Sequence, residues 1–427
     1  METGGLKSRF ARMMALAALA LSFCPTAPAA PGYKVLHSFT GGADGDGNQG
    51  VALDKKGDVY GASLGGGNQN CRDGCGVVFR LAPSGGNWGF AVLYDFTGEN
   101  DGEAPNAGLI LDASGNLYGT TVWGGAYGYG TVFELTLGSS GWTEKALLDF
   151  DGDSGGEPIA GVIADGRGNL YGTTPGGGAN GGGVAFELTP GSGGWNETVL
   201  NSFYPSDYPD YAPGGSSPYA GLTLGETGNL YGVTEGGGNG PPHCPVSEGC
   251  GVVFELSMQS GRWKEHVLHR FTGFSRDGAE PSSGVTLDSS GNLYGTTTIG
   301  GGAGCEGGCG TVYKLTPQSN GKWKETLLYN FGNGQNGYAP DGGVVIDKAG
   351  VLYGTTGYSG SGCGCGVVYK LAPGKNGKWT YTVLHAFTGS DGAVPAGGLT
   401  MDDKGNLYGG TVLGGADGYG VVFKLTP

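Results

Sequence analysis

Eight of the nine cysteines fall into four close pairs, and two nearby thiols can form a local disulfide or bind a metal. The pairs are Cys71 with Cys75, Cys244 with Cys250, Cys305 with Cys309, and Cys363 with Cys365. Eight thiols allow 105 pairings in principle. Zinc is the competing interpretation, but a structural zinc site takes four ligands and the usual Cys-x-x-Cys spacing is absent. In an exported chain, four local disulfides are the simplest outcome, and the one-residue spacing within the last pair is the most demanding geometrically.

Aspartates next to glycine recur at one place in the sequence pattern, and oxygen-rich loops of this kind can bind calcium. They are Asp44, Asp46, Asp101, Asp277 and Asp391, with Asn336 in the corresponding place of another copy. The stretches beginning at Asp44 and Asp149 invite comparison with an EF-hand loop. Neither has glycine at the sixth position or glutamate at the twelfth. Because Asp-Gly is also an ordinary turn pair, we favour turns, expect no cofactor, and keep calcium as the alternative.

Aromatic side chains are concentrated in two loops and are the candidate binding residues. One loop carries Trp123, Tyr127 and Tyr129, and a long connection carries Tyr204, Tyr208, Tyr211 and Tyr219. Flat rings beside carboxylates and amides suit stacking on sugars or contact with a partner protein. The alternative is that the rings fold over glycine-rich backbone and cover it.

The histidines give no sign of a catalytic site. His37, His269 and His385 occupy the same position of a repeated segment, which favours a structural role. His266 and His243 have no matching nucleophile motif such as Gly-x-Ser-x-Gly. Catalysis concentrates unlike groups at one place, and no such place stands out. We therefore expect a non-catalytic binding function, with a propeller-type glycan hydrolase or lyase as the alternative.

The elements that must position these residues come from one unit repeated along the chain. The tripeptide Leu-Tyr-Gly, once Val-Tyr-Gly, has its tyrosine at Tyr60, Tyr118, Tyr171, Tyr231, Tyr294, Tyr353 and Tyr408, with spacings of 53 to 63 residues. Each unit carries four short apolar segments separated by turn residues, as in 108–112, 116–121, 130–135 and 142–150. Ninety-six glycines and 14% charged residues also fit short strands joined by tight turns. Each unit is therefore predicted to be a four-stranded antiparallel meander.

The two ends of the chain predict that these units close into a ring. The seventh unit stops after its third segment, 420–425, and the N-terminal segment 33–39 resembles the missing fourth one. A ring closed in this way removes free sheet edges, which an open array would expose. We predict an all-β, seven-bladed β-propeller over residues 30–427. The loops between second and third strands and the connections between blades should then emerge on one side, here called the cysteine-bearing rim.

The residues resemble a known family, the GloVer tandem-repeat proteins. The shared elements are Gly-Asn-Leu-Tyr-Gly-Thr-Thr, Gly-Gly and Gly-Val-Val-Phe-Glu-Leu, and they recur from about Tyr33 to Pro427. The resemblance implies an exported bacterial protein of undetermined activity and transfers no catalytic residue. Members often carry a C-terminal sorting anchor, whereas this sequence ends at Pro427 without a hydrophobic tail. A freely secreted or periplasmic protein is the expectation.

The N-terminus predicts export. Lys7, Arg9 and Arg12 precede an apolar run at 13–23, which is typical of a signal peptide, and we expect residues 1–29 to be removed. The remaining chain has a formal net charge of −17, because the segment carries +2 of the total of −15. Such an acidic protein should not bind nucleic acid, and no membrane contact is expected after cleavage. A secreted monomer that binds carbohydrate or protein outside the cell is the predicted function.

Overall fold

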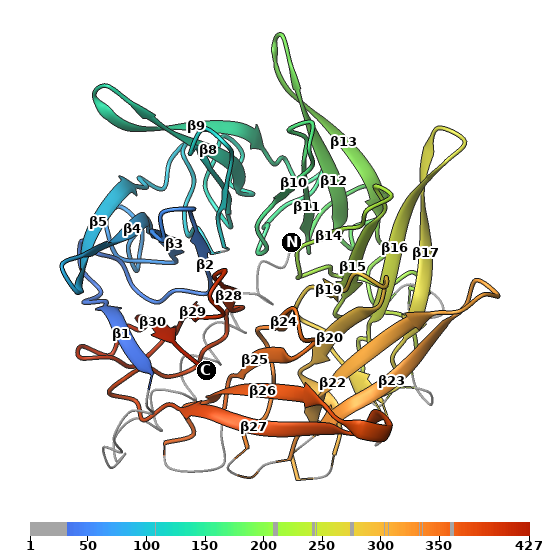
Figure 1. Ribbon diagram of the computed structural model, residues 1–427. Helices are drawn as coiled ribbons and strands as arrows, with labels where there is room; N and C mark the ends of the chain where they lie inside the picture. The colour runs from blue at the N-terminus through green and yellow to red at the C-terminus, as the bar shows by residue number, and fades with distance from the viewer. Residues whose placement is uncertain are drawn as a thin grey trace.

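The repeats fold as seven antiparallel sheets arranged in a ring, the predicted seven-bladed β-propeller (Figure 1). The computed structural model describes residues 32–427, except 107, 208–211, 241–243, 245, 274–276, 303, 306, 333, 335 and 359–362. The expected signal peptide lies outside the described residues. Within them no α-helix occurs, and the one helical segment is a 3₁₀ turn, Lys375–Gly377. None of the described helical structure is long and apolar enough to cross a membrane.

Each blade contains four strands, and their order in the sheet, from first to fourth, leads from the centre of the ring to its outside (Figure 1). The first strands are β2 Val51–Leu53, β6 Ile110–Leu111, β10 Ile163–Ala164, β14 Thr223–Leu224, β19 Thr286–Leu287, β24 Val344–Ile346 and β28 Thr400–Met401. The second strands are β3 Val59–Ser63, β7 Leu117–Thr121, β11 Leu170–Thr174, β15 Leu230–Thr234, β20 Leu293–Thr297, β25 Leu352–Thr356 and β29 Leu407–Gly410. The third strands are β4 Val77–Ser84, β8 Thr131–Gly138, β12 Val184–Gly191, β16 Val252–Gln259, β22 Gly308–Pro317, β26 Val367–Pro373 and β30 Val421–Leu425.

The fourth strands form the outside of the ring. They are β5 Asn87–Asp95, β9 Gly141–Asp149, β13 Gly194–Ser202, β17 Arg262–Arg270, β23 Trp323–Asn330, β27 Trp379–Ala386 and, from the N-terminus, β1 Tyr33–Ser38. Blade 5 also carries two short strands, β18 Gly278–Ala279 and β21 Ile299–Gly301, on the cysteine-bearing rim. Blade 1 begins at β2, and blade 7 consists of β28, β29, β30 and β1.

Ring closure follows the prediction. β1 pairs antiparallel with β30, from Tyr33 opposite Leu425 to Ser38 opposite Val421, and Figure 1 shows β1 beside β30. Leu36 and Phe39 are buried in a cluster that also contains residues of blade 1. The first described strand therefore both completes the last blade and packs against the next one.

The glycine of each Leu-Tyr-Gly has a steric cause. An aromatic ring from the third strand lies on it, so that a Cβ at Gly172 would be 2.5 Å from Cζ of Phe186. The same contact occurs in all seven blades, between Gly61 and Phe79, Gly119 and Phe133, Gly172 and Phe186, Gly232 and Phe254, Gly295 and Tyr313, Gly354 and Tyr369, and Gly409 and Phe423. These rings are fully buried, and Phe186, for example, packs with Phe150 at the end of the preceding blade.

The aspartates of the first hairpins cap turns. In blade 2, Oδ1 of Asp112 accepts hydrogen bonds from the backbone N–H groups of Ser114 and Asn116, at 2.8 and 2.9 Å. Asp165, Asp288, Asp347 and Asp402 make the same pair of bonds in their blades. Their repetition is therefore a requirement of the hairpin.

Candidate functional site

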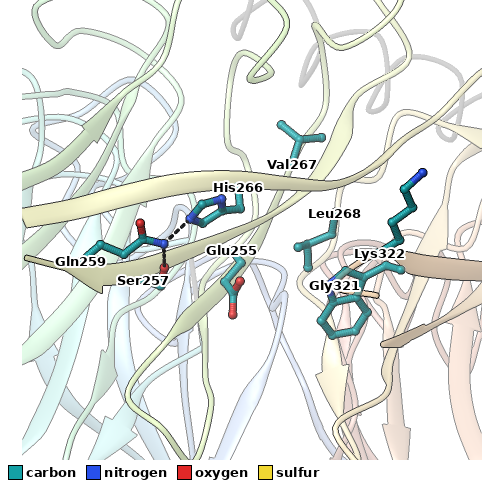
Figure 2. Close-up of a pocket in the computed structure, with 9 residues that line it drawn as sticks. Glu255, Ser257, Gln259, His266, Val267, Leu268, Gly321 and Lys322 are labelled. Atoms are coloured by element: carbon teal, nitrogen blue, oxygen red, sulfur yellow. Dashed lines mark hydrogen bonds between the residues drawn. The ribbon is translucent and has the colours of Figure 1, made fainter. Parts of the chain in front are cut away.

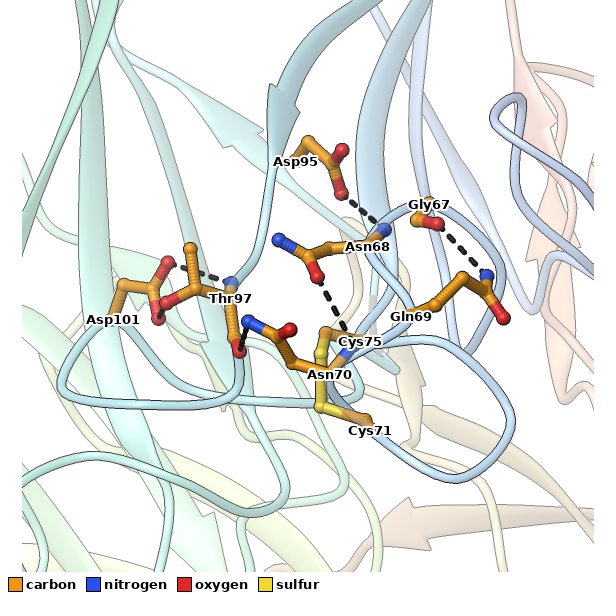
Figure 3. Close-up of a disulfide and its surroundings, with 9 residues drawn as sticks. All are labelled: Gly67, Asn68, Gln69, Asn70, Cys71, Cys75, Asp95, Thr97 and Asp101. Atoms are coloured by element: carbon orange, nitrogen blue, oxygen red, sulfur yellow. Dashed lines mark hydrogen bonds between the residues drawn. A yellow bond between two sulfur atoms is a disulfide. The ribbon is translucent and has the colours of Figure 1, made fainter.

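The cysteine-bearing rim contains the four predicted local disulfides. Cys71 is bonded to Cys75, Cys244 to Cys250, Cys305 to Cys309, and Cys363 to Cys365, with Cα–Cα distances of 5.1 to 5.8 Å. Figure 3 shows the first of these beside two anchoring bonds. The backbone N–H of Asn68 donates to Asp95 at 2.7 Å, and the hydroxyl of Thr97 donates to Asp101 at 2.6 Å. The first bond ties the loop to the end of β5, and Nδ2 of Asn70, which donates to the carbonyl of Thr97 at 3.5 Å, ties the loop to the connection that follows.

The second cysteine of each disulfide has a backbone carbonyl that accepts a hydrogen bond from the segment leading into the next blade. The carbonyl of Cys75 accepts the N–H of Ala104 at 3.0 Å, and Ala104 has a positive φ of 57°. Glu280, Ala339 and Val394 have positive φ and donate in the same way to Cys250, Cys309 and Cys365. The same bond forms where no cysteine is present, for example from Glu157 to Tyr129 at 2.8 Å. The disulfide therefore closes a loop whose backbone contact with the next blade also forms without cysteines.

Tyrosine takes the place of the second cysteine in two blades without a disulfide. Tyr129 and Tyr419 occupy the position of Cys75, because their carbonyls accept the corresponding N–H groups. Their rings cover glycines of the adjoining connection: a Cβ at Gly156 would be 3.2 Å from Cδ1 of Tyr129, and one at Gly41 would be 2.5 Å from Cε1 of Tyr419. In blade 1 the sulfur of Cys71 lies in this way against Gly98. Tyr129 thus covers backbone, as the alternative interpretation of the aromatic residues holds, while its other face is exposed.

The aspartates of the blade connections are held by turn donors. Asp44, Asp101, Asp277 and Asp391 each accept both the backbone N–H and the hydroxyl of a threonine that directly follows a buried phenylalanine. Asp46 is different, since it accepts the N–H of Gly65 at 2.6 Å and its burial raises its pKa to about 6. These bonds support the turn interpretation of the Asp-Gly pattern.

A belt of side chains connects neighbouring fourth strands, and we call it the inter-blade belt. It comprises the residues two and six positions before the phenylalanine that follows each fourth strand. The first set, two positions before this phenylalanine, consists of His37, Tyr94, Leu148, Asn201, His269, Tyr329 and His385. The second set, six positions before it, consists of Tyr33, Phe90, Glu144, Glu197, Glu265, Glu325 and Tyr381. Residues of the first set face residues of the second set from the next blade. Three of these pairs are stacked rings. The distance between ring centroids is 3.8 Å for Tyr33 and His385, 3.9 Å for Phe90 and His37, and 4.3 Å for Tyr381 and Tyr329.

The three repeated histidines of the belt each face a connection aspartate. Nε2 lies 3.0 Å from Asp44 for His37, 3.4 Å from Asp277 for His269, and 3.1 Å from Asp391 for His385. Burial, the largest cause, lowers the pKa of His37 although Asp44 opposes the shift. The predicted structural role of these histidines therefore has a defined partner in each case.

Four glutamates of the belt are unusual because each has one buried carboxyl oxygen, Oε1, that accepts no hydrogen bond from the described residues. They are Glu144, Glu197, Glu265 and Glu325. Burial raises the pKa of each carboxyl, to about 7, 6, 7 and 7 respectively, and nearby Asp101, Asp151 and Asp277 add to the shift of the first, second and fourth. Their common place in the repeat is the sequence signal that could have identified them.

The predicted aromatic residues do not form one cluster. Trp123 is half-buried and packs with Leu64, Ile159 and Tyr219 around buried Ala104 and Val122, so that side chains of four blades meet there. Tyr127, Tyr129 and Tyr204 are 64%, 43% and 41% exposed on the rim. Tyr208 and Tyr211 lie outside the described residues. The rim therefore presents separate tyrosines, and the tryptophan belongs to an apolar cluster that joins blades.

Two cavities lie between neighbouring blades, and neither was predicted. The larger one, of about 530 Å³, lies between blades 4 and 5 and is lined by residues of β16, β17 and the turn before β23 (Figure 2). Its polar wall includes His266, which is hydrogen-bonded to Gln259 at 2.7 Å. The smaller cavity, of about 180 Å³, lies between blades 3 and 4 and is lined by Tyr204, Asn201, Glu265 and the 213–215 segment, among others. It brings a predicted binding residue next to one of the buried glutamates.

Comparison with known proteins agrees with the repeat pattern. The sequence matches the Gloeobacter/Verrucomicrobia repeat family over residues 25–242 and 244–427. The chain belongs to this family. No curated protein matches it.

Three solved structures resemble this Gloeobacter/Verrucomicrobia repeat protein at low sequence identity. A fungal alcohol oxidase with bound copper is 16% identical with a TM-score of 0.53, covering 95% of this chain and 76% of its own. A candidate 6-phosphogluconolactonase from Bacteroides uniformis is 12% identical with a TM-score of 0.49, covering 85% and 89%. A protein of unknown function from Dyadobacter fermentans is also 12% identical, with a TM-score of 0.45 and coverage of 93% and 99%. At such identities the alcohol oxidase shows a shared fold alone.

Proposed function

We propose that this protein is a non-catalytic binding module that works outside the cell, with carbohydrate or protein as its ligand. The observation that supports this proposal best is the distribution of exposed aromatic rings. Among the described phenylalanine, tyrosine and tryptophan side chains, those more than about one-third exposed are all tyrosines of the cysteine-bearing rim: Tyr127, Tyr129, Tyr204 and Tyr419. Exposed tyrosines gathered on one rim suit recognition, because a tyrosine ring offers a large, rigid contact area and loses little conformational entropy on binding.

The disulfides also support the proposed location. Structural disulfides form and persist in oxidising compartments, and all eight paired cysteines are bonded. A secreted or periplasmic protein is the location that fits them.

The cavity between blades 3 and 4 is the feature that favours the enzymatic alternative, a glycan hydrolase or lyase. Burial raises the pKa of Glu265 to about 7, which is suitable for a general acid. Glycoside hydrolysis uses a pair of carboxyl groups. The residues that line this cavity include one carboxyl group, that of Glu265, which accepts a hydrogen bond from Asn201 at 3.1 Å. Binding is therefore the better-supported function.

Binding to an array of immobilised glycans, and to proteins of the cell exterior, tests the proposal. Tyr127→Ala and Tyr204→Ala should each be compared with the wild type, and we expect at least one to weaken binding about tenfold, as loss of a stacked aromatic contact does. Leu137→Ala is the matched control, because Leu137 is 65% exposed near the end of β8, beside the turn to β9. Retained affinity in both tyrosine variants, or turnover of a glycan by the wild type, would contradict a binding function of this rim.

A further inference from the structure

The junction between blades 4 and 5 differs from the other two junctions that contain a histidine. At His37 and His385 the imidazole is covered by an aromatic ring from the next blade, Phe90 in the first case and Tyr33 in the second. At His269 the equivalent residue of the next blade is Glu325. A carboxylate thus replaces the stacking ring, beside a histidine that already faces Asp277.

The three side chains converge on a small volume. Their nearest ligand atoms, one from each of His269, Asp277 and Glu325, all lie within 4.8 Å of one another. Oε1 of Glu325 is shielded from solvent and accepts no hydrogen bond from the described residues. The other junction glutamates have no imidazole partner: Asn201 faces Glu265, and Tyr94 faces Glu144.

The aspartate is held firmly in place before any ligand binds. Oδ2 of Asp277 accepts the N–H and the hydroxyl of Thr272, both at 2.9 Å, and Oδ1 accepts the N–H of Gly278 at 2.8 Å. These bonds direct Oδ1 toward Nε2 of His269, 3.4 Å away. Side-chain exposures of 20% for His269 and 11% for Asp277 leave the group reachable from solvent.

Two carboxylates beside an imidazole attract a cation. We propose that His269, Asp277 and Glu325 bind a divalent transition-metal ion, Zn²⁺ or Mn²⁺, with water completing its coordination. One nitrogen and two oxygen donors suit these ions, whereas calcium takes oxygen ligands. Metal–ligand distances of about 2.0 to 2.2 Å require the three atoms to move together by about 1 Å. The ion would be held by His269 of β17 and Asp277 of the following connection on one side, and by Glu325 of β23 on the other. It would thus link blade 4 to blade 5.

The test uses the full-length protein stripped of metal by a chelator and then titrated with ZnCl₂, MnCl₂ or CaCl₂ in a calorimeter. We expect one equivalent of Zn²⁺ or Mn²⁺ to bind, a higher Tm with the ion present, and weaker or undetectable binding of Ca²⁺. Replacement of Zn²⁺ by Co²⁺ should give visible absorption bands that report the nitrogen and oxygen ligands.

Matched variants distinguish this site from general attraction to an acidic surface. Glu325→Phe restores the ring that covers His37, so it should fold and lose at least about tenfold in affinity, and His269→Gln should do the same. Glu144→Gln removes the equivalent glutamate at a junction without histidine and should leave binding unchanged. Absence of binding by the wild type, or equal binding by Glu325→Phe and His269→Gln, would overturn the proposal.

Discussion

Glycine follows tyrosine in every repeat because a Cβ atom at this position would clash with a buried aromatic ring. At Gly172 a methyl group would meet Cζ of Phe186 at 2.5 Å and Cγ1 of Val162 at 3.2 Å, and all three lie in the packed interior of blade 3. The ring has no free space into which it could move, because such interiors are densely packed. Leu-Tyr-Gly is therefore a packing signature, and its repetition carries no information about chemistry.

Gly172→Ala should lower the free energy of unfolding by about 1 to 3 kcal/mol, as overpacking of a core does. Gly166 is the control in the same blade, since a Cβ there would meet nothing within 4 Å. Gly166→Ala should be neutral or slightly stabilising. Denaturant unfolding of both variants measures this, and equal stability of the two would contradict the steric explanation.

The buried glutamates predict a pH dependence of stability with a defined sign. Burial raises the pKa of Glu265 from 4.5 to about 7, and Arg270 and Asn201 oppose the shift. Between these two values the folded state holds a proton that the unfolded state has lost, so stability falls as the pH rises through this window. Glu265→Gln removes this loss.

The Glu265→Gln variant should therefore be more stable than the wild type at pH 8, on the order of 2 kcal/mol, and nearly equal to it at pH 4. Urea unfolding at both pH values measures the difference. Glu226→Gln, at an exposed turn, is the control and should be neutral. Parallel pH profiles for Glu265→Gln and the wild type would show that this carboxyl is not shifted.

At the scale of loops and strands, the disulfides act locally. Cys71 and Cys75 close a loop with a sequence separation of 4, and such a short loop saves little chain entropy, at most about 2 kcal/mol. Their more specific effect is on the carbonyl of Cys75, which accepts the N–H of Ala104 from the next blade. A loop that moves would weaken this contact between blades.

The double variant Cys71→Ser, Cys75→Ser should lower Tm by only a few degrees while the Ala104 amide exchanges hydrogen much faster. The Glu157 amide, which donates to Tyr129 where no disulfide exists, is the internal reference and should be unchanged. Hydrogen exchange followed by mass spectrometry resolves the two segments. Unchanged exchange around Ala104 would remove the stiffening role from this disulfide.

The sequence predicts the parts of this architecture that depend on the repeat itself. The four strands of each unit, the local pairing of cysteines and the turn role of Asp101 all follow from short-range patterns, and the structure agrees with them. The repeat shows that the belt glutamates share one position, but it does not show which residue of the neighbouring blade each of them faces, as Glu325 of β23 faces His269 of β17. Trp123 was placed with Tyr127 on the basis of sequence proximity, yet it packs with residues of three other blades.

At the scale of the whole molecule, closure by the N-terminal strand determines which loops share a rim. Without β1, the edge of β30 would be open, and the cluster around Leu36, Phe39 and Tyr408 would lose its cover. Each of the two buried side chains of this segment contributes about 2 to 3 kcal/mol by leaving water. The proposed binding face and the proposed metal site both depend on neighbouring blades that are held in register by the closed ring.

The most direct test is the thermal stability of a chain that begins at Thr40, compared with one that begins at Gly32, each with and without a synthetic peptide of residues 33–39. The account predicts that the shorter chain has a Tm lower by roughly 10 °C and that the added peptide raises it toward that of the longer chain. An unchanged Tm of the shorter chain, with no effect of the peptide, would contradict ring closure by β1.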